Sequence, residues 1–409
     1  MRILQVNKYH YYRGGAERYY FEISRLLERA GHEVIHFSMA GDRNEPSPWS
    51  EYFVPETDFR CPAGALRRAR DAAHTVWNPE AYERIGRLVK RVRPDVAHLH
   101  NIAHQLSGSI VVALRRRGVP TVHSLHDYKL VCPAYRRFRD GRPCDDCRRR
   151  RFWNAVRHRC VLDSRAASLV AAVETSLYSA FGLYTRGIDL FHSPSLFVKR
   201  TIEDWGFPEE RIFAFPLTID LTPYVPADRD EGYFLYLGRL SHEKGLPVLV
   251  DAAARFPEAE IRVAGEGPEK PALEGRIAER GVRSIRFLGY LGGEALREQI
   301  AGCRAVLLPS EYDDNSPVVI YESFALGKPI LGAERGGIPE MVRPDETGLL
   351  FPAGDGAALA AGMRRLAGDP PLARRLGRAA RERMETEYGA EKHLERLLAL
   401  YEAAIKRHG

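Results

Sequence analysis

The sequence predicts an α/β protein with two domains, each built on a doubly wound, mostly parallel sheet. Three observations lead to this prediction. The chain has 409 residues, more than one hydrophobic core normally organises, its apolar segments alternate with helical patterns, and the alternation restarts in the second half. Hydrophobic residues make up 44% and charged residues 28% of the chain, which is typical of a globular fold.

The first half alternates strands and helices from its start. A glycine-containing turn follows the first strand, and the helix after it stops at Gly31. The later elements follow the same order. The predicted strands lie over 3–6, 33–38, 96–100 and 121–125, and the predicted helices end at Gly31 or lie over 79–91 and 107–117. Strands joined in this way by helices pair in parallel.

The second half repeats the pattern after a proline-containing segment. Strands are predicted over 233–237, 261–264, 285–288 and 305–308, and a helix over 246–254. The segment 215–226 contains three prolines and is the predicted linker. The predicted domains are therefore 1–213 and 214–388. A helical stretch over 372–408 breaks at Tyr388 and Gly389, so 389–409 is expected to pack back on the first domain.

The amino-terminal segment leads directly into a strand and lacks the features of a secretory leader. No window approaches the roughly 20 apolar residues of a membrane-spanning helix, so a cytoplasmic protein is expected, with any membrane contact at a surface. The net charge of +7 is concentrated in the first half. The arginine clusters lie at 67–70, 115–117, 136–139 and 148–151. They fit solvated faces as well as an acidic partner such as phospholipid or polyphosphate, and nucleic acid less well.

Two cations lie in the loop that follows the first strand of the second domain. Arg239 and Lys244 are five residues apart in the run from Gly238 to Gly245. In open α/β sheets ligands bind at the carboxyl ends of strands, where this loop is expected. A diphosphate leaving group gains negative charge as its bond to a sugar breaks, so two fixed cations would stabilise that transition state. A solvated turn is the alternative.

A second loop, over 309–332, combines acidic and small polar residues with the start of a helix. Asp313, Asp314, Asn315 and Ser316 precede Pro317, which suits the beginning of a helix. The free N–H groups at that start could bind phosphate or sugar hydroxyls, and Glu322 could bind a ribose diol. The same residues could instead only cap and solvate the helix.

A third loop follows the first strand and contains Gly14, Gly15 and Glu17. Paired glycines let a backbone approach a ligand closely, although they also serve as plain turns. The loop has no Walker lysine and does not complete the dinucleotide fingerprint. ATP hydrolysis and NAD chemistry therefore lose support.

Together these loops resemble glycosyltransferase family four over nearly the whole chain. The resemblance rests on the runs 14–17, 238–245 and 314–322, followed by Gly327, Lys328 and Pro329. It implies the GT-B fold, with two facing Rossmann-like domains and a cleft between them. It also implies transfer of a sugar from a nucleotide-diphosphate sugar with retention of anomeric configuration, without a cofactor or divalent metal in catalysis.

The resemblance also implies roles for individual residues. Its catalytic positions are His126, Arg239, Lys244 and Asp314. Its donor-binding positions are Gly14, Gly15, Glu17, Gly238, Gly265, Tyr290, Asn315, Ser316, Pro317 and Glu322. Asp314 stands where the family usually has a glutamate, so its carboxylate is one methylene shorter, and Glu311 is the alternative. Apart from the resemblance, Tyr9, His100 and Asn101 lie beside the ends of first-domain strands and are predicted acceptor contacts, and core packing is the alternative for the aromatic ring of Tyr9.

Four of the six cysteines cluster in the first half, at Cys132, Cys144, Cys147 and Cys160. In a reducing compartment this spacing favours a structural zinc over disulfides, and inert thiols remain open. The surrounding arginines and aromatic residues fit a membrane interface or a lipid-linked phosphate acceptor, and they fit a self-braced loop nearly as well.

The sequence leaves the donor as a UDP or GDP sugar and the acceptor as a hydroxyl of a glycan, a lipid-linked intermediate or a secondary metabolite. Two rival functions remain open at this point. One is a nucleotide-sugar epimerase or hydrolase on a similar frame, which would process donor without acceptor. The other is a basic scaffold or nucleic-acid-binding protein, which would leave the strand-end loops unexplained.

Overall fold

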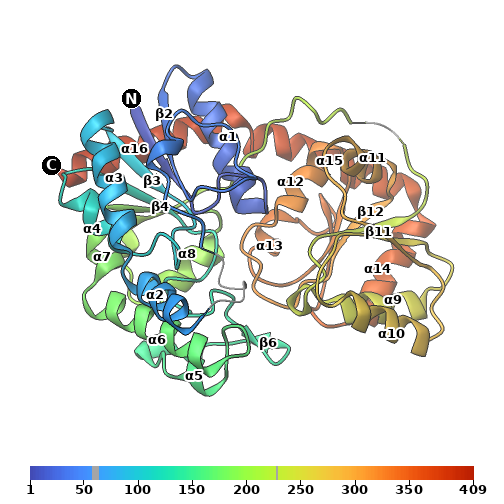
Figure 1. Cartoon of the computed structure of the whole chain (residues 1–409). Helices are drawn as coiled ribbons and strands as arrows, with labels where there is room; N and C mark the ends of the chain where they lie inside the picture. The colour runs from blue at the N-terminus through green and yellow to red at the C-terminus, as the bar shows by residue number, and fades with distance from the viewer. Residues whose placement is uncertain (58–63, 227–228) are drawn as a thin grey trace. The chain divides into compact units, whose positions relative to one another are not determined.

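The chain folds into two compact α/β units (Figure 1), as the computed structural model of residues 1–57, 64–226 and 229–409 describes. The first unit comprises Met1–Arg137, Cys144–Leu217 and Ala390–Gly409. The second comprises Phe138–Pro143 and Thr218–Gly389. The predicted α/β class with two doubly wound sheets is confirmed.

The first unit is built on a six-stranded parallel sheet with the order β2-β1-β3-β4-β7-β8. Its strands are β1 (Arg2–Val6), β2 (Glu33–Phe37), β3 (Val96–Leu99), β4 (Thr121–Ser124), β7 (Leu190–Ser193) and β8 (Ile212–Ala214). Most strand residues are buried, as expected for a parallel sheet covered by helices on both faces. A small antiparallel hairpin, β5 (Phe138–Arg139) and β6 (Arg142–Pro143), is grouped with the second unit.

Helices surround this sheet. They are α1 (Gly15–Arg29), α2 (Ala65–Val76), α3 (Pro79–Val92), α4 (Ser109–Arg115), α5 (Asn154–Arg157), α6 (Arg165–Ala180), α7 (Leu183–Gly187), α8 (Leu196–Glu203) and α16 (Ala390–His408). The last helix packs against α1, β3 and β4. Its buried Tyr401 hydroxyl lies 2.8 Å from His98 Nδ1 in β3, which ties the carboxyl-terminal helix to the sheet.

The second unit repeats the design with the order β11-β10-β9-β12-β13-β14. Its strands are β9 (Phe234–Leu237), β10 (Ile261–Ala264), β11 (Ile285–Gly289), β12 (Ala305–Leu308), β13 (Ile330–Ala333) and β14 (Gly348–Phe351). Its helices are α9 (Leu246–Arg255), α10 (Lys270–Glu279), α11 (Gly293–Gly302), α12 (Val318–Ala325), α13 (Ile338–Met341), α14 (Gly356–Gly368) and α15 (Pro370–Glu387). Short 3₁₀ turns lie at Ser50–Tyr52, Arg148–Arg150, Glu209–Arg211 and His242–Lys244.

The elements differ from the expected ones mainly at their ends. The helix expected over 107–117 is α4, which begins at Ser109 because Ser107 has a positive φ of 60°. The helix expected to begin at Pro317 is α12, which begins at Val318 with Pro317 as its N-cap residue. Strands β7, β8, β13 and β14 had no predicted counterpart. None of the helices described combines the length and the apolar character needed to cross a bilayer.

Candidate active site

In each sheet the chain order reverses beside one strand. The second sheet extends from β9 to β10 on one side and to β12 on the other, and the first extends from β1 to β2 and to β3. In open α/β sheets ligands bind at the carboxyl ends of the strands beside such a reversal. The loops after β9 and β12, and those after β1 and β3, are therefore the candidates.

The loops after β9 and β12 lie directly against each other. The backbone N–H groups of Glu311 and Tyr312 both donate to the carbonyl oxygen of Glu243, at 3.1 and 3.3 Å. Gly245 has a φ of 69°, in the left-handed region, and a Cβ there would collide with the carbonyl oxygen of Pro309. The close approach of the two loops therefore depends on glycine at this position.

This approach brings Lys244 and Asp314 together. The Lys244 ammonium lies 2.7 Å from Asp314 Oδ2, and the Asp314 side chain is only 7% exposed. The carboxylate also accepts hydrogen bonds from the hydroxyls of Ser310, at 3.1 Å, and Tyr312, at 2.9 Å. Lys244 Nζ lies 4.7 Å from the centre of the Tyr312 ring. The carboxylate thus holds the ammonium in one place at the carboxyl end of β9.

The electrostatics keep this lysine charged. Burial alone would lower the pKa of its ammonium, but the charge of Asp314 and the hydrogen bond to it outweigh burial, so the pKa of Lys244 lies above its usual value. The pKa of Tyr312 is raised strongly by burial and by the same carboxylate, which keeps its hydroxyl a donor. A permanently cationic lysine is suited to binding an anionic leaving group.

Arg239 lies in the same loop, five residues before Lys244, and is exposed. Within the described residues its guanidinium makes no hydrogen bond or ion pair, so its donors are available to a ligand. Gly238, beside it, has a φ of 147°, and Gly265 after β10 has a φ of 151°. A Cβ at Gly265 would collide with the Gly238 carbonyl oxygen, so these two loops also depend on glycine for their approach.

The remaining donor positions of this unit lie at or near α12. Pro317 is its N-cap residue, and Asn315 and Ser316 just before it are each 9% exposed. Glu322 lies within the helix, is 5% exposed, and accepts a 3.4 Å hydrogen bond from the Tyr224 hydroxyl. Tyr290, after the edge strand β11, is 75% exposed and lies apart from this group along the sheet.

The first unit places its glycine pair at the start of α1. Gly14 is the N-cap residue and Gly15 the first helical residue. Glu17, in the first turn, is buried and accepts a 3.5 Å hydrogen bond from the Asn7 side chain. Its carboxylate lies close enough to touch a Cβ at Gly14, at 3.6 Å. The carboxylate of Glu17 is therefore held next to the glycine turn by its hydrogen bond from Asn7.

His126 and His100 form a hydrogen-bonded pair at the ends of β4 and β3. His126 Nε2 lies 2.9 Å from His100 Nδ1, and the two rings stack with centres 5.2 Å apart. His100 Nε2 lies 2.8 Å from the side-chain oxygen of Gln5 in β1. The His100 ring, at the end of β3, is thus held between Gln5 of β1 and His126 at the end of β4.

The chain of contacts also assigns the tautomers. An amide oxygen only accepts, so His100 carries its hydrogen on Nε2 and presents a lone pair on Nδ1. His126 must then donate from Nε2, which leaves its Nδ1 as an acceptor. Burial, followed by the charges of His192 and His123, lowers the pKa of His126 to about 3, so the ring is neutral near pH 7. A neutral imidazole with a free lone pair can accept a hydrogen bond from a hydroxyl.

Tyr9 and Asn101 lie at the same edge of the sheet. The Lys8 backbone donates to the carbonyl oxygen of Asn101 at 2.9 Å, which joins the loops after β1 and β3. The Arg13 guanidinium lies 4.3 Å from the centre of the half-buried Tyr9 ring. The predicted acceptor residues of the first unit are therefore gathered beside the histidine pair.

Several residues of these arrangements had not been predicted. Tyr312 and Ser310 hold Asp314, and Gln5 orients the histidines. His98 and His192 extend the same network, each within 2.8 Å of the Ser124 hydroxyl. For Gln5, His98 and His192 the sequence held one signal, a polar residue inside an otherwise apolar strand, because a buried strand normally consists of apolar side chains.

The four clustered cysteines are half-buried and Cys303 is buried, and none of these five described cysteines forms a disulfide. Within the described ranges no three or more histidine, cysteine or acidic side chains are arranged to hold a metal ion. Burial, and the charges that Cys132, Cys160 and Cys144 would carry as thiolates, raise the pKa of Cys147 to about 12. The other three thiols are thus within electrostatic range of Cys147.

Two family comparisons cover most of the chain. Residues 13–222 match the family described as Glycosyltransferase Family 4, and residues 223–383 match Glycosyl transferases group 1. A glycogen synthase from Mycobacterium tuberculosis is 27% identical over 402 residues, covering 92% of this chain and 87% of the relative. The sulfoquinovosyl transferase SQD2 of Arabidopsis thaliana is 28% identical over 305 residues, covering 73% of this chain and 54% of the relative.

Solved structures show the same fold. The sucrose-phosphate synthase of Thermosynechococcus elongatus superposes with a TM-score of 0.72 at 23% identity, covering 98% of each chain. The Anabaena protein Alr3699/HepE, solved in complex with UDP and glucose, superposes with a TM-score of 0.70 at 18% identity, covering 97% of this chain and 98% of that one. The predicted GT-B fold is confirmed.

Proposed function

The chain belongs to glycosyltransferase family 4, and from that premise we propose that it transfers a hexose from a UDP or GDP sugar to a hydroxyl acceptor with retention of anomeric configuration. That the chain is a glycosyltransferase using nucleotide-sugar donors follows from the family and its relatives. The residue roles, the stereochemistry and the acceptor are the proposal.

The observation that carries the proposal is the Lys244–Asp314 ion pair at the carboxyl edge of the second sheet. Asp314 keeps the ammonium charged and fixed before any ligand arrives. Little reorganisation is then needed when the donor diphosphate gains charge, and this preorganisation is the main source of electrostatic catalysis. Arg239, exposed and unpaired within the described residues, would supply a guanidinium to the same diphosphate, and Glu322 would bind the ribose.

The proposed step is front-side attack. The bond from the anomeric carbon to the diphosphate oxygen breaks, the acceptor oxygen bonds to the same face of that carbon, and its proton passes to the departing phosphate oxygen. Lys244 and Arg239 offset the charge that develops on the diphosphate. His126 Nδ1 would accept a hydrogen bond from a sugar hydroxyl, and Tyr9, His100 and Asn101 would contact the acceptor. No cofactor enters these steps.

Replacing Arg239 tests this assignment. Arg239→Ala should weaken UDP or GDP binding and lower turnover roughly 100-fold, and Arg239→Lys should recover only part of it, because lysine cannot bind a phosphate through two parallel N–H groups. The readouts are ligand-induced thermal shifts and product formation. Normal turnover in Arg239→Ala would refute the proposed role.

Product analysis separates transfer from its rivals. Incubated with donor alone, a transferase should leave most of the nucleotide sugar intact, whereas a hydrolase or epimerase would consume or convert it. NMR of the product gives the anomeric configuration, and an inverted product would end the proposal of retention. Salt-sensitive binding of RNA or DNA without nucleotide-sugar binding would support the scaffold alternative.

We keep two further predictions as proposals. A lipid-linked acceptor at an anionic membrane fits the arginines of the first half. A structural zinc on Cys132, Cys144, Cys147 and Cys160 is supported by the absence of disulfides among these four described residues and by the closeness of the other three thiols to Cys147. Protein purified without added zinc should contain about one zinc per chain and lose thermal stability with a chelator. Fewer than about one zinc per three chains would contradict it.

A further inference from the structure

Helix α6 exposes apolar side chains to solvent along its length. Leu169 and Val173 are each 42% exposed, Leu177 is 38% exposed, and Phe181, the C-cap residue, is 73% exposed. A spacing of four residues places these side chains on one side of the helix. We call them the α6 face. A surface helix normally presents charged residues outward, so this helix has the reverse arrangement.

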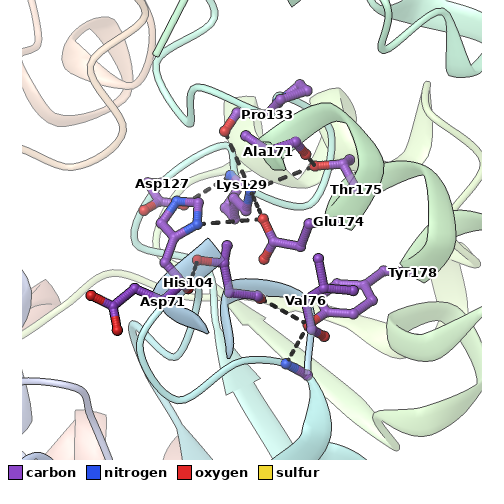
Figure 2. Close-up of polar contacts among 12 residues, drawn as sticks. Asp71, Val76, His104, Asp127, Lys129, Pro133, Ala171, Glu174, Thr175 and Tyr178 are labelled. Carbon is purple, nitrogen blue, oxygen red and sulfur yellow. Dashed lines mark hydrogen bonds and ion pairs between the residues drawn. The ribbon is translucent and has the colours of Figure 1, made fainter. Parts of the chain in front are cut away.

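Polar contacts on the inner side explain why α6 is oriented in this way. Figure 2 shows the fully buried Glu174 facing Lys129 and His104, with its Oε2 accepting a 2.7 Å hydrogen bond from Lys129 Nζ. His104 Nδ1 lies 3.4 Å from the same oxygen. One turn further on, the Tyr178 hydroxyl donates to the Val76 carbonyl at 2.6 Å and accepts from the Gly108 N–H at 2.8 Å.

These contacts fix the rotation of the helix. Burial opposes ionisation of Glu174, but the charge of Lys129 and the hydrogen bonds from Lys129 and His104 outweigh it and lower the pKa of Glu174 to about 2, so the carboxylate is ionised. Turning α6 to bury Leu169 and Leu177 would separate an ionised, buried pair and leave both charges without partners, which is strongly unfavourable. The outward apolar face is therefore a built feature of the fold.

Cationic segments flank the α6 face. Helices α2 and α5 both pack against α6, and the three lie together in Figure 1. Each segment adds an exposed apolar side chain, with Leu66 in α2 88% exposed and Trp153 beside α5 66% exposed. From residue 148 to 165 the chain has seven arginines and one acid, Asp163. The arginines of the two flanks are Arg67, Arg68, Arg70, Arg148, Arg149, Arg150, Arg151, Arg157, Arg159 and Arg165.

We propose that the α6 face docks on an anionic phospholipid surface, with Leu169, Leu177 and Phe181 entering the boundary between headgroups and acyl chains. A helix with an apolar face and arginines beside that face binds in the plane of such a surface, because the apolar side chains are buried and the arginines attract the anionic headgroups. Guanidinium groups also bind phosphate through paired N–H donors. The inference gives the anionic membrane proposed above a defined docking surface on this chain, and it does not depend on the proposed sugar transfer.

Vesicle flotation with the full chain tests the docking surface. Wild type should float with vesicles of phosphatidylcholine and phosphatidylglycerol, float poorly with phosphatidylcholine alone, and be released by high salt. The double variant Leu169→Ser/Leu177→Ser should bind roughly tenfold more weakly, because two leucine side chains are then no longer transferred from water into the membrane. The matched control is Leu196→Ser on α8, where Leu196 is 49% exposed, and it should bind as wild type.

Unchanged circular dichroism and donor-induced thermal shift in the double variant would show that it is folded. Equal recovery of wild type with neutral and anionic vesicles would overturn the proposal, as would full binding by the double variant. If vesicles are not bound but wild type forms a dimer that the double variant does not, the face is an interface between copies, and the membrane proposal is wrong.

Discussion

The two units present the carboxyl edges of similar parallel sheets, yet the electrostatics of these edges are opposite. In the second unit Lys244 and Asp314 form an ion pair at 2.7 Å. In the first unit His100 is buried and His126 half-buried, and the two rings are hydrogen-bonded and neutral. The edge of the second unit is suited to binding a charged group, and the edge of the first unit to binding hydroxyl groups. A shared topology therefore places a site without determining its chemistry, which depends on the side chains at each strand end.

The largest expected difference between the two units is in how their stability changes at low pH. Burial depresses the pKa of six histidines of the first unit to about 3 or 4, namely His10, His36, His123, His126, His192 and His393. The second unit contains a single histidine, His242. The unfolded chain binds more protons below pH 6.5, so the stability contributed by these neutral rings is complete above that pH and falls as the pH decreases.

At pH 5 each of these rings should cost about 2 kcal/mol of unfolding free energy. Calorimetry between pH 5 and 8 should show the transition of the first unit moving to lower temperature while that of the second changes little. Hydrogen exchange assigns each transition to its unit. Equal shifts of both transitions would remove the contrast.

Lys244→Ala should have the next largest effect. Removing a preorganised cation from the diphosphate site typically lowers turnover by about 10² to 10³. The variant also leaves Asp314 buried with only the Ser310 and Tyr312 hydroxyls, so some loss of stability should accompany it. Turnover and circular dichroism are the measurements, with Lys270→Ala, an exposed lysine of the same unit, as the control. Turnover close to wild type would contradict the role given to the charged edge.

Gly245→Ala tests whether the charged edge depends on backbone approach. A Cβ at this position is strained by the left-handed φ and collides with the Pro309 carbonyl oxygen. We expect a loss of about 2 kcal/mol in the stability of the second unit, together with reduced turnover, because the loop carrying Lys244 must move. Gly281→Ala is a control, since its φ is 62° and nothing lies within 4 Å of the added atom. Similar losses in both variants would show that φ alone matters.

His126→Gln should have the smallest effect. Loss of one hydrogen bond to a sugar hydroxyl should lower kcat/KM roughly tenfold. Because the pKa of His126 is about 3, the activity of wild type should show no titration of this ring between pH 6 and 8. The pH–rate profiles of wild type and variant should then be parallel, with His74→Gln on α2 as the control. A difference that follows an ionisation near pH 6.5 would mean that the imidazole is protonated in use.

Much of the second-unit site could be predicted from local signals. Lys244 and Asp314 lie in loops directly after the buried apolar strands β9 and β12. Gly238, Gly245 and Gly265 lie where two backbones approach closely. A glycine in a loop can indicate such a position from the sequence, because few other residues tolerate a positive φ. The histidine pair was harder to predict from the sequence, because its partner Gln5 lies in a different strand and a lone histidine is usually structural.

By itself the sequence determined the two α/β units, the strand-end loops and the residue types they carry, because these depend on short-range periodicity and turn chemistry. The tertiary structure alone decided that Lys244 pairs with Asp314, 70 residues away, that Gln5 orients two histidines, and that α6 turns its leucines outward. Each of these outcomes depends on which distant segments become neighbours in the sheet. The chain-order reversal beside β9 and the buried Glu174–Lys129 pair create such neighbours, and no local pattern encodes them.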